Sequence, residues 1–240
     1  MSTLTLVRHG QALPYLEDSD RLSDLGRRQA QALAEYWLRP AGTVGAFDEL
    51  VCGSLRRQIE TAEILRASMP RAALRQDPRF NEYDSAGIHR ELAPRLAETN
   101  QDFAALWKGW QANRGAADQN RHFQSMFQAL LQGWCEDGLI HPHVEPHVES
   151  WPVFHARVQD GLKDILQGGG RSRRVVVVTS GGPIGVAVQT AVGAPPSSAL
   201  NIHWRTRNCS LTGFLFTEGK LSLDYFNATP HLTPELESFR

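Results

Sequence analysis

The stretch Thr3–Gly10, which reads TLTLVRHG, joins an apolar run to a charged pair and a glycine. A short run of this kind predicts a buried strand that opens into a loop. In open α/β sheets, ligands bind at the loops that follow the carboxyl ends of strands. The guanidinium of Arg8 can hold an anion through parallel hydrogen bonds, and the imidazole of His9 can act as a nucleophile or proton carrier. Alone, the pair fits a surface arginine and a capping histidine equally well.

Composition and net charge limit which binding partners and which cellular compartment the sequence predicts. The chain has 240 residues, 41% of them hydrophobic, and a net charge of −1. This size suits one large domain, with or without an insert, and the charge gives no reason to expect nucleic-acid or membrane partners. No apolar run is long enough to span a membrane, and the N-terminus enters a strand rather than a signal peptide. Cys52, Cys135 and Cys209 lack metal-binding spacing, so we expect reduced thiols in a cytoplasmic protein.

Strand and helix patterns alternate through the first third of the chain. Helical periodicity covers Asp24–Leu38 and Leu55–Ser68, and short runs at Leu50–Cys52 and Ala73–Arg75 predict strands. This alternation predicts a largely parallel sheet. The continuous apolar run Val175–Val178 predicts a central strand that is covered on both faces.

The remaining elements complete the predicted fold. Helices are expected from Ser150 to Gln167 and over Ile184–Val192, followed by an antiparallel hairpin of Ser210–Phe216 and Leu221–Phe226. We therefore expect one α/β domain over residues 1–240. Its architecture is a three-layer sandwich, with a central mostly parallel sheet between helices.

A helical insert is expected at about residues 90–148, where the strand patterns disappear. Phe103–Trp110 and Phe123–Trp134 have helical periodicity. The insert can form a core or a cap over a cleft, and its tryptophans can belong to that core or to a dimer face. The segment His141–Glu149 alternates His and Glu between prolines, which favours a solvated loop over a metal site. The sequence leaves the oligomeric state and the substrate open.

Several polar groups that could together bind an anion lie after three of the predicted strands and at the start of the second predicted helix. They are Arg8, His9, Arg56, Arg57, Glu82, Asp84, Ser180, Gly181 and Gly182. Phosphoryl transfer requires several cations and N–H donors around the migrating group. A neutral histidine can accept that group, and a carboxylic acid can protonate the leaving alcohol. Together these groups predict a phosphoryl site that needs neither a metal nor a cofactor.

Several motifs resemble one family in the same order along the chain. Leu6–Gln11 (LVRHGQ) resembles the signature of the histidine phosphatase superfamily, branch 1, which has the phosphoglycerate-mutase-like fold. Leu22–Gly26, Arg57–Ala62, Glu82–Asp84 and Asn208–Ser210 are similar to further motifs of that family. The resemblance covers most of the chain outside the insert.

The resemblance implies a role for each of these residues. His9 becomes the phosphohistidine nucleophile, and Arg8 and Arg57 hold the phosphoryl group. Glu82 becomes the general acid and then the base that activates water, with Asp84 as a second choice. The implied enzyme is a phosphatase, a phosphoric monoester hydrolase. Its substrate is a small phosphorylated molecule or a phosphoprotein, and its pocket binds phosphate or another anion.

Ser180 departs from the family pattern, which usually has a second catalytic histidine at this position. A serine hydroxyl is shorter than an imidazole and neutral, and loss of one such donor costs about 10²–10³ in rate. Ser180 and the amide of Gly181 are still expected to bind phosphate, so we expect a slower phosphatase. The alternatives are a weak or inactive member that binds phosphorylated ligands or a protein, and a phosphomutase. A histidine from elsewhere, His147 or His203, can also replace the missing imidazole.

Overall fold

The computed structural model describes residues 1–13, 20–39, 47–136, 148–170 and 172–239. The chain divides into two compact units. Met1–Glu82 and Arg157–Arg240 form the first unit, and Tyr83–Ala156 form the second.

The first unit is built on a six-stranded sheet with the order β3-β2-β4-β1-β5-β6. The strands are β1 (Ser2–Arg8), β2 (Glu49–Cys52), β3 (Ala73–Gln76), β4 (Arg174–Thr179), β5 (Leu211–Thr217) and β6 (Lys220–Ala228). β1, β2, β3 and β4 are parallel, and β5 and β6 are antiparallel neighbours. The largely parallel sheet and the C-terminal hairpin are therefore confirmed. β4 lies between β2 and β1 with Val175–Val178 fully buried, as its apolar run predicts.

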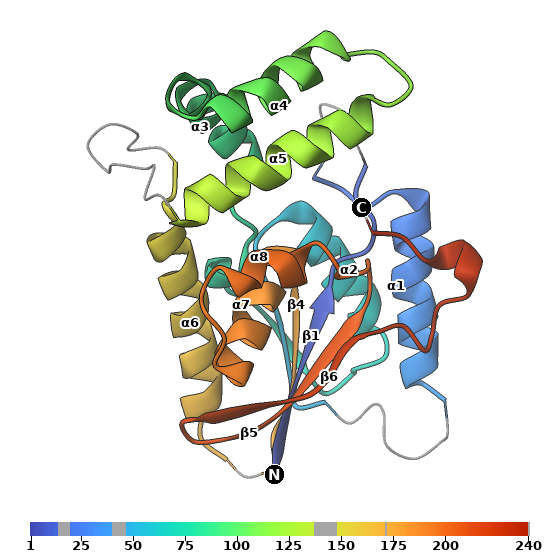
Figure 1. The fold of residues 1–240 in the computed structure, drawn as a ribbon. Coiled ribbons are helices and arrows are strands. Elements are labelled where there is room, and N and C mark those ends of the chain that lie inside the picture. The colour runs from blue at the N-terminus through green and yellow to red at the C-terminus, as the bar shows by residue number, and fades with distance from the viewer. Residues whose placement is uncertain (14–19, 40–46, 137–147, 171, 240) are drawn as a thin grey trace. The chain divides into compact units, whose positions relative to one another are not determined.

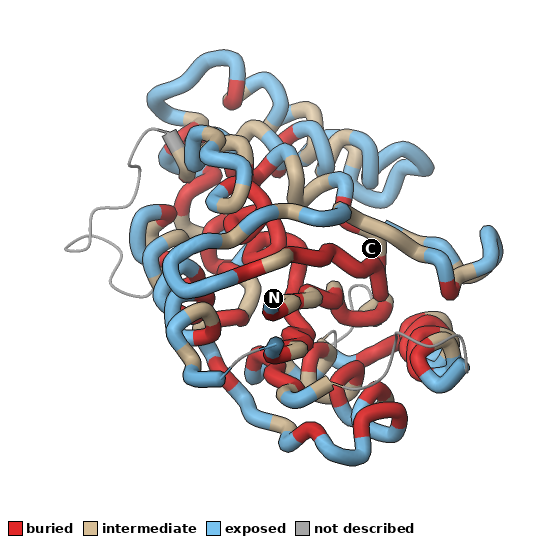
Figure 2. Tube along the Cα trace, turned by 90° about the horizontal axis from the view of Figure 1, so that it is seen from below, coloured by how far each residue is buried: buried red, intermediate tan, exposed pale blue. Residues whose placement is uncertain are grey.

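Helices cover both faces of this sheet. They are α1 (Asp24–Trp37), α2 (Arg56–Arg66), α6 (Trp151–Gln167), α7 (Gly181–Val192) and α8 (Ser198–His203). Leu33 of α1 and Leu65 of α2 share one buried cluster with Val178 of β4. α7 lies on the opposite side of the sheet from α1 (Figure 1). The expected three-layer α/β architecture is thus correct, and the N-terminal strand lies among buried segments (Figure 2).

The helix starts follow local chemistry. Ser23 caps α1 by accepting a hydrogen bond from the Gly26 amide at 3.0 Å. α7 begins at Gly181 rather than at the predicted Ile184. Pro183 fits this earlier start because the first turn of a helix needs no amide donor. The short helix α8 was not predicted.

The second unit contains α3 (Ser85–Thr99), α4 (Gln101–Ala112), α5 (Gln119–Glu136) and the start of α6. α4 and α5 cover the two predicted helices of the insert, whereas α3, which contains Pro94, was missed. Trp134 is 1% exposed and packs against Tyr83, so it belongs to the core of this unit. The predicted insert of residues 90–148 lies within this unit, and a role as a cap stays a prediction.

Candidate active site

His9 follows β1 and is held as a neutral imidazole. Its Nδ1 lies 2.7 Å from the Gly10 carbonyl oxygen, which can only accept, so Nδ1 carries the proton. Arg57 Nε donates to His9 Nε2 at 3.1 Å, so Nε2 carries the lone pair. Burial, followed by the charges of Arg57 and Arg8, lowers the pKa of His9 well below its usual value. The ring therefore presents an unprotonated Nε2, with its lone pair, beside an arginine.

The backbone around His9 is fixed from several directions. The His9 amide donates to the Thr179 carbonyl at 2.8 Å, and the Gly10 amide donates to Thr61 Oγ1 at 3.1 Å. A Cβ at Gly10 would lie 2.4 Å from the carbonyl oxygen of Gly26, so only glycine fits at this position. The close approach of this loop to α1 thus explains the glycine of the opening motif.

Arg57, in the first turn of α2, is oriented by two partners. Its Nε reaches His9, and its Nη1 forms an ion pair with Asp20. Asp20 also accepts a hydrogen bond from the Arg56 amide at 2.8 Å. The Arg56 side chain turns away to Glu60 at 2.9 Å. Arg57 is therefore the arginine beside His9, as the resemblance implies, and Asp20 is a partner that sequence reasoning missed.

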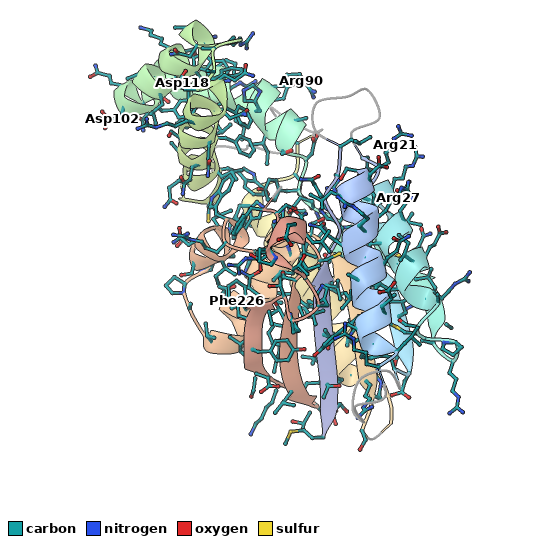
Figure 3. All side chains as sticks on the ribbon, turned by 90° about the vertical axis from the view of Figure 1, so that its right-hand side faces the viewer. Arg21, Arg27, Arg90, Asp102, Asp118 and Phe226 are labelled. Atoms are coloured by element: carbon teal, nitrogen blue, oxygen red, sulfur yellow. The ribbon has the colours of Figure 1, made fainter. Side chains whose placement is uncertain are left out.

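Hydrogen bonds of Glu60 and Arg8 hold neighbouring segments of the chain next to these arginines. Glu60 accepts hydrogen bonds from the Leu22 amide and from Arg27, which is labelled on α1 in Figure 3, and so ties α1 to α2. Arg8 donates through Nη1 to the carbonyls of Thr206 and Phe239. After burial and the charge of Arg57, the charge of Arg8 also lowers the pKa of His9.

Glu82 lies at the N-terminus of α7. Both of its carboxylate oxygens accept from the Gly182 amide, at 3.2 and 3.1 Å. A carboxylate is stabilised there by the positive end of the helix dipole. The amide of Gly182, which the sequence assigned to a bound anion, thus binds the protein's own carboxylate. Asp84 instead caps α3 within the second unit, accepting from the Gly87 amide at 2.9 Å.

The Ser180 side chain is fully buried, and its hydroxyl accepts from Gln58 Nε2 at 2.8 Å. Gln58 also donates to the Phe80 carbonyl at 3.1 Å. Sequence reasoning missed Gln58, although it lies inside the arginine motif of α2. A direct contact of Ser180 with phosphate stays a prediction.

His203, at the end of α8, lies in the site. Its Nε2 is 3.8 Å from Glu82 Oε2, and the two side chains are 12% and 13% exposed. A Cβ at Gly181 would lie 2.3 Å from Cδ2 of the imidazole, so the ring sits directly on this glycine. Of the two histidines proposed to replace the missing imidazole, His203 therefore reaches the site, and His147 lies outside the described residues.

Several expectations concern groups away from this site. Among the described residues, no group of three or more His, Cys, Asp or Glu is arranged to hold a metal ion. Most of the His141–Glu149 loop lies outside those residues.

Cys52, Cys135 and Cys209 are free thiols, and burial raises the pKa of Cys52 to about 11. In the described part of the chain, no helix combines the length and apolar character needed to cross a membrane.

The chain matches a family model over residues 4–137 and 120–229, that of the histidine phosphatase superfamily (branch 1). It therefore belongs to this superfamily. The expected enzyme class, a phosphoric monoester hydrolase, agrees with that membership. No curated protein sequence matches the chain.

Solved structures resemble the fold over nearly the whole chain. The mycobacterial glucosyl-3-phosphoglycerate phosphatase in complex with inorganic phosphate has 24% sequence identity to this chain and a TM-score of 0.60. The matched region covers 97% of this chain and 100% of the phosphatase chain. A phosphoserine phosphatase variant from Entamoeba histolytica, in complex with phosphoserine, is 17% identical, with a TM-score of 0.61 and the same two coverages, 97% and 100%. YhfR of Bacillus stearothermophilus is 18% identical, with a TM-score of 0.62, and covers 96% of this chain and 99% of its own.

Proposed function

We propose that the protein hydrolyses phosphate monoesters of small molecules through a phosphohistidine on His9. The hydrogen bond from Arg57 Nε to His9 Nε2 at 3.1 Å carries this proposal. With Nδ1 facing the Gly10 carbonyl, this bond directs the Nε2 lone pair toward the same guanidinium that would hold the phosphoryl group. The nucleophile and the anion-binding group are thereby already paired.

In the first step, Nε2 of His9 attacks phosphorus and the bond from phosphorus to the ester oxygen breaks. Arg57 and Arg8 stabilise the negative charge of the phosphoryl oxygens. Glu82, in its protonated form, gives its proton to the departing alcohol oxygen. Asp84 is a weaker candidate for this acid because its carboxylate caps α3.

In the second step, water attacks the phosphohistidine. Glu82, now ionised, accepts a proton from the water as the oxygen bonds to phosphorus. The N–P bond breaks, inorganic phosphate leaves, and His9 returns to its neutral form. Each group ends in its starting state, so the cycle requires no cofactor.

Small phosphorylated metabolites are the proposed substrates. Phosphatases of similar fold are named for glucosyl-3-phosphoglycerate and phosphoserine, which are both small phosphate monoesters. We propose the same chemical class for this chain, without assigning one member of it.

The test measures phosphate released from phosphoserine, 3-phosphoglycerate, glucosyl-3-phosphoglycerate and a phosphopeptide. Wild type is compared with His9→Ala and with His122→Ala, which removes an exposed imidazole of α5 as a control. We expect turnover only in wild type and the control, together with an acid-labile phosphoryl group on His9. Equal turnover by His9→Ala, or none by any protein, contradicts the proposal. An isomerised ester in place of free phosphate identifies a mutase.

A further inference from the structure

His203 is the feature of the site that the function above does not use. It belongs to α8, a short helix that follows α7 and packs against it. Its imidazole stacks on Trp204, with ring centroids 5.0 Å apart and an interplanar angle of 20°. This stacking, together with the missing side chain at Gly181, fixes where the ring lies.

The imidazole faces the reacting groups of the site. Its Nε2 lies 3.8 Å from Glu82 Oε2, whose carboxylate is bound by the Gly182 amide. Burial is the largest cause of the lowered pKa of His9, and a charge on His203 lowers this pKa further, so the two imidazoles interact. Burial and the charge of Arg8 lower the pKa of His203 itself, whereas Glu82 raises it. His203 thus lies among the nucleophile, one phosphate-binding arginine and the general acid.

The chain also lacks an alternative imidazole at the start of α7. Position 180 holds a serine whose hydroxyl is engaged by Gln58. An imidazole that approaches from α8 requires space above the first turn of α7, and Gly181 supplies this space. A Cβ there would lie 3.0 Å from Nε2 as well as 2.3 Å from Cδ2 of His203.

We infer that His203 is a further catalytic residue, which binds a phosphoryl oxygen through Nε2–H and shares a proton with Glu82. This inference rests on the proposed function. When the alcohol leaves, one proton moves from the Glu82–His203 pair to its oxygen, and the pair is left with one proton fewer. When water attacks the phosphohistidine, the pair takes one proton from that water. The Nε2–H bond to phosphoryl oxygen strengthens as charge develops in both transition states.

The test compares wild type with His203→Leu, His203→Gln and the control His122→Gln. Leucine removes the donor, whereas the glutamine amide nitrogen can donate from about the position of Nε2. We expect His203→Leu to lower kcat by about 10²–10³, which is typical for removal of one transition-state donor. His203→Gln should be intermediate, and His122→Gln should match wild type. Single-turnover formation of the phosphohistidine on His9 should slow by the same factors.

A packing role predicts a different outcome. If both His203 variants are folded by thermal unfolding and keep kcat within about threefold of wild type, the inference is overturned. If His203→Leu does not fold, His203→Gln is compared with His203→Asn, whose shorter amide cannot reach the position of Nε2. Equal rates in that pair also overturn it. Turnover that depends on His9 but not on His203 rejects only this inference, whereas the absence of any turnover or His9 adduct in wild type rejects the proposed function.

Discussion

Two hydrogen bonds and burial set the protonation state of the His9 ring. The Gly10 carbonyl oxygen accepts from Nδ1 and so fixes the proton there. Arg57 Nε donates to the lone pair on Nε2, and burial keeps the ring neutral. Each of these effects favours the neutral form that the proposed mechanism requires, because a protonated imidazole has no lone pair to donate. Hydrogen bonding and burial therefore hold His9 in the form that the proposed nucleophilic attack requires.

Asp20 is expected to weaken phosphate binding, because its carboxylate pairs with the guanidinium that would hold the anion. Asp20→Asn keeps an oxygen that can accept from the Arg56 amide but removes the negative charge. We expect inorganic phosphate to bind about fivefold more tightly, corresponding to about 1 kcal/mol for a partly exposed ion pair. Isothermal titration with phosphate measures this change. Asp160→Asn, which removes an exposed charge from α6, is the control, and unchanged or weaker binding by Asp20→Asn contradicts the prediction.

Ser180 is expected to act mainly through Gln58. Ser180→Ala removes the hydroxyl that accepts from Gln58 Nε2. We expect a loss of about 1 kcal/mol in the free energy of unfolding, which is typical for one buried hydrogen bond. We also expect kcat to stay within about threefold of wild type, since His203 is inferred to supply the second donor. Urea unfolding and steady-state kinetics separate the two effects. A hundredfold loss of kcat would instead place the hydroxyl on the phosphoryl group.

At the scale of elements, α6 holds the loop that carries Glu82. Arg157 Nη1 donates to the carbonyls of Arg79 and Asn81, at 2.8 and 2.9 Å. The loop begins with a short 3-10 helix, Pro78–Phe80, that is capped by Asp77. The Arg157 guanidinium of α6 thus fixes the backbone of this loop, and that backbone holds Glu82, the proposed general acid, at the start of α7.

Arg157→Gln should therefore separate acid catalysis from anion binding. The shorter amide cannot reach both carbonyls, so Glu82 loses its fixed position. A displacement of about 1 Å can cost about 10² in rate, and we expect kcat to fall by about 10- to 100-fold. Competitive inhibition by phosphate should be unchanged because the contacts of His9 with Arg57 remain. Arg28→Gln, on the exposed side of α1, is the control, and equal losses in kcat and phosphate affinity argue against this role.

At the scale of the whole molecule, buried neutral histidines make folding stability depend on pH. Burial lowers the pKa of His231 from 6.5 to about 4. The unfolded chain binds the proton more readily than the folded chain between these values. Stability is therefore fully present above pH 6.5 and is lost as the pH falls toward 4. Burial also lowers the pKa values of His9 and His203, which act in the same direction.

His231→Gln removes one of these titrating groups. Between pH 7.5 and 4.5, His231 should account for about 2–3 kcal/mol of the lost free energy of unfolding, since each unit of pKa shift corresponds to about 1.4 kcal/mol. Urea unfolding of wild type and His231→Gln at both pH values measures this difference. An identical loss in the two proteins contradicts the assignment to His231.

The amino-acid sequence by itself determined the sheet and most of its helices, and it predicted the central chemistry. The apolar run Val175–Val178 and the hairpin are local patterns, because burial on both faces and turn geometry leave a direct signature in neighbouring residues. His9, Arg57 and Glu82 each lie where a strand ends or a helix begins, and the family resemblance favoured Arg57 over Arg56 and Glu82 over Asp84. Their pairing followed from the rule that such ends meet at one edge of a parallel sheet.

Only the tertiary structure decided which other side chains reach that edge. Asp20 and His203 carry no local signature, since a polar residue looks the same in sequence whether it faces solvent or another element, and Gln58 was missed although it lies inside the Arg57–Ala62 motif. The short helix α8 brings the His203 ring onto Gly181. The Arg57 side chain forms an ion pair with Asp20. Both contacts join residues that are far apart in the chain. The sequence therefore predicted the loss of an imidazole at Ser180 and named His203 as one of two replacements. Packing of α8 against α7 places His203 in the site, whereas His147 lies outside the described residues.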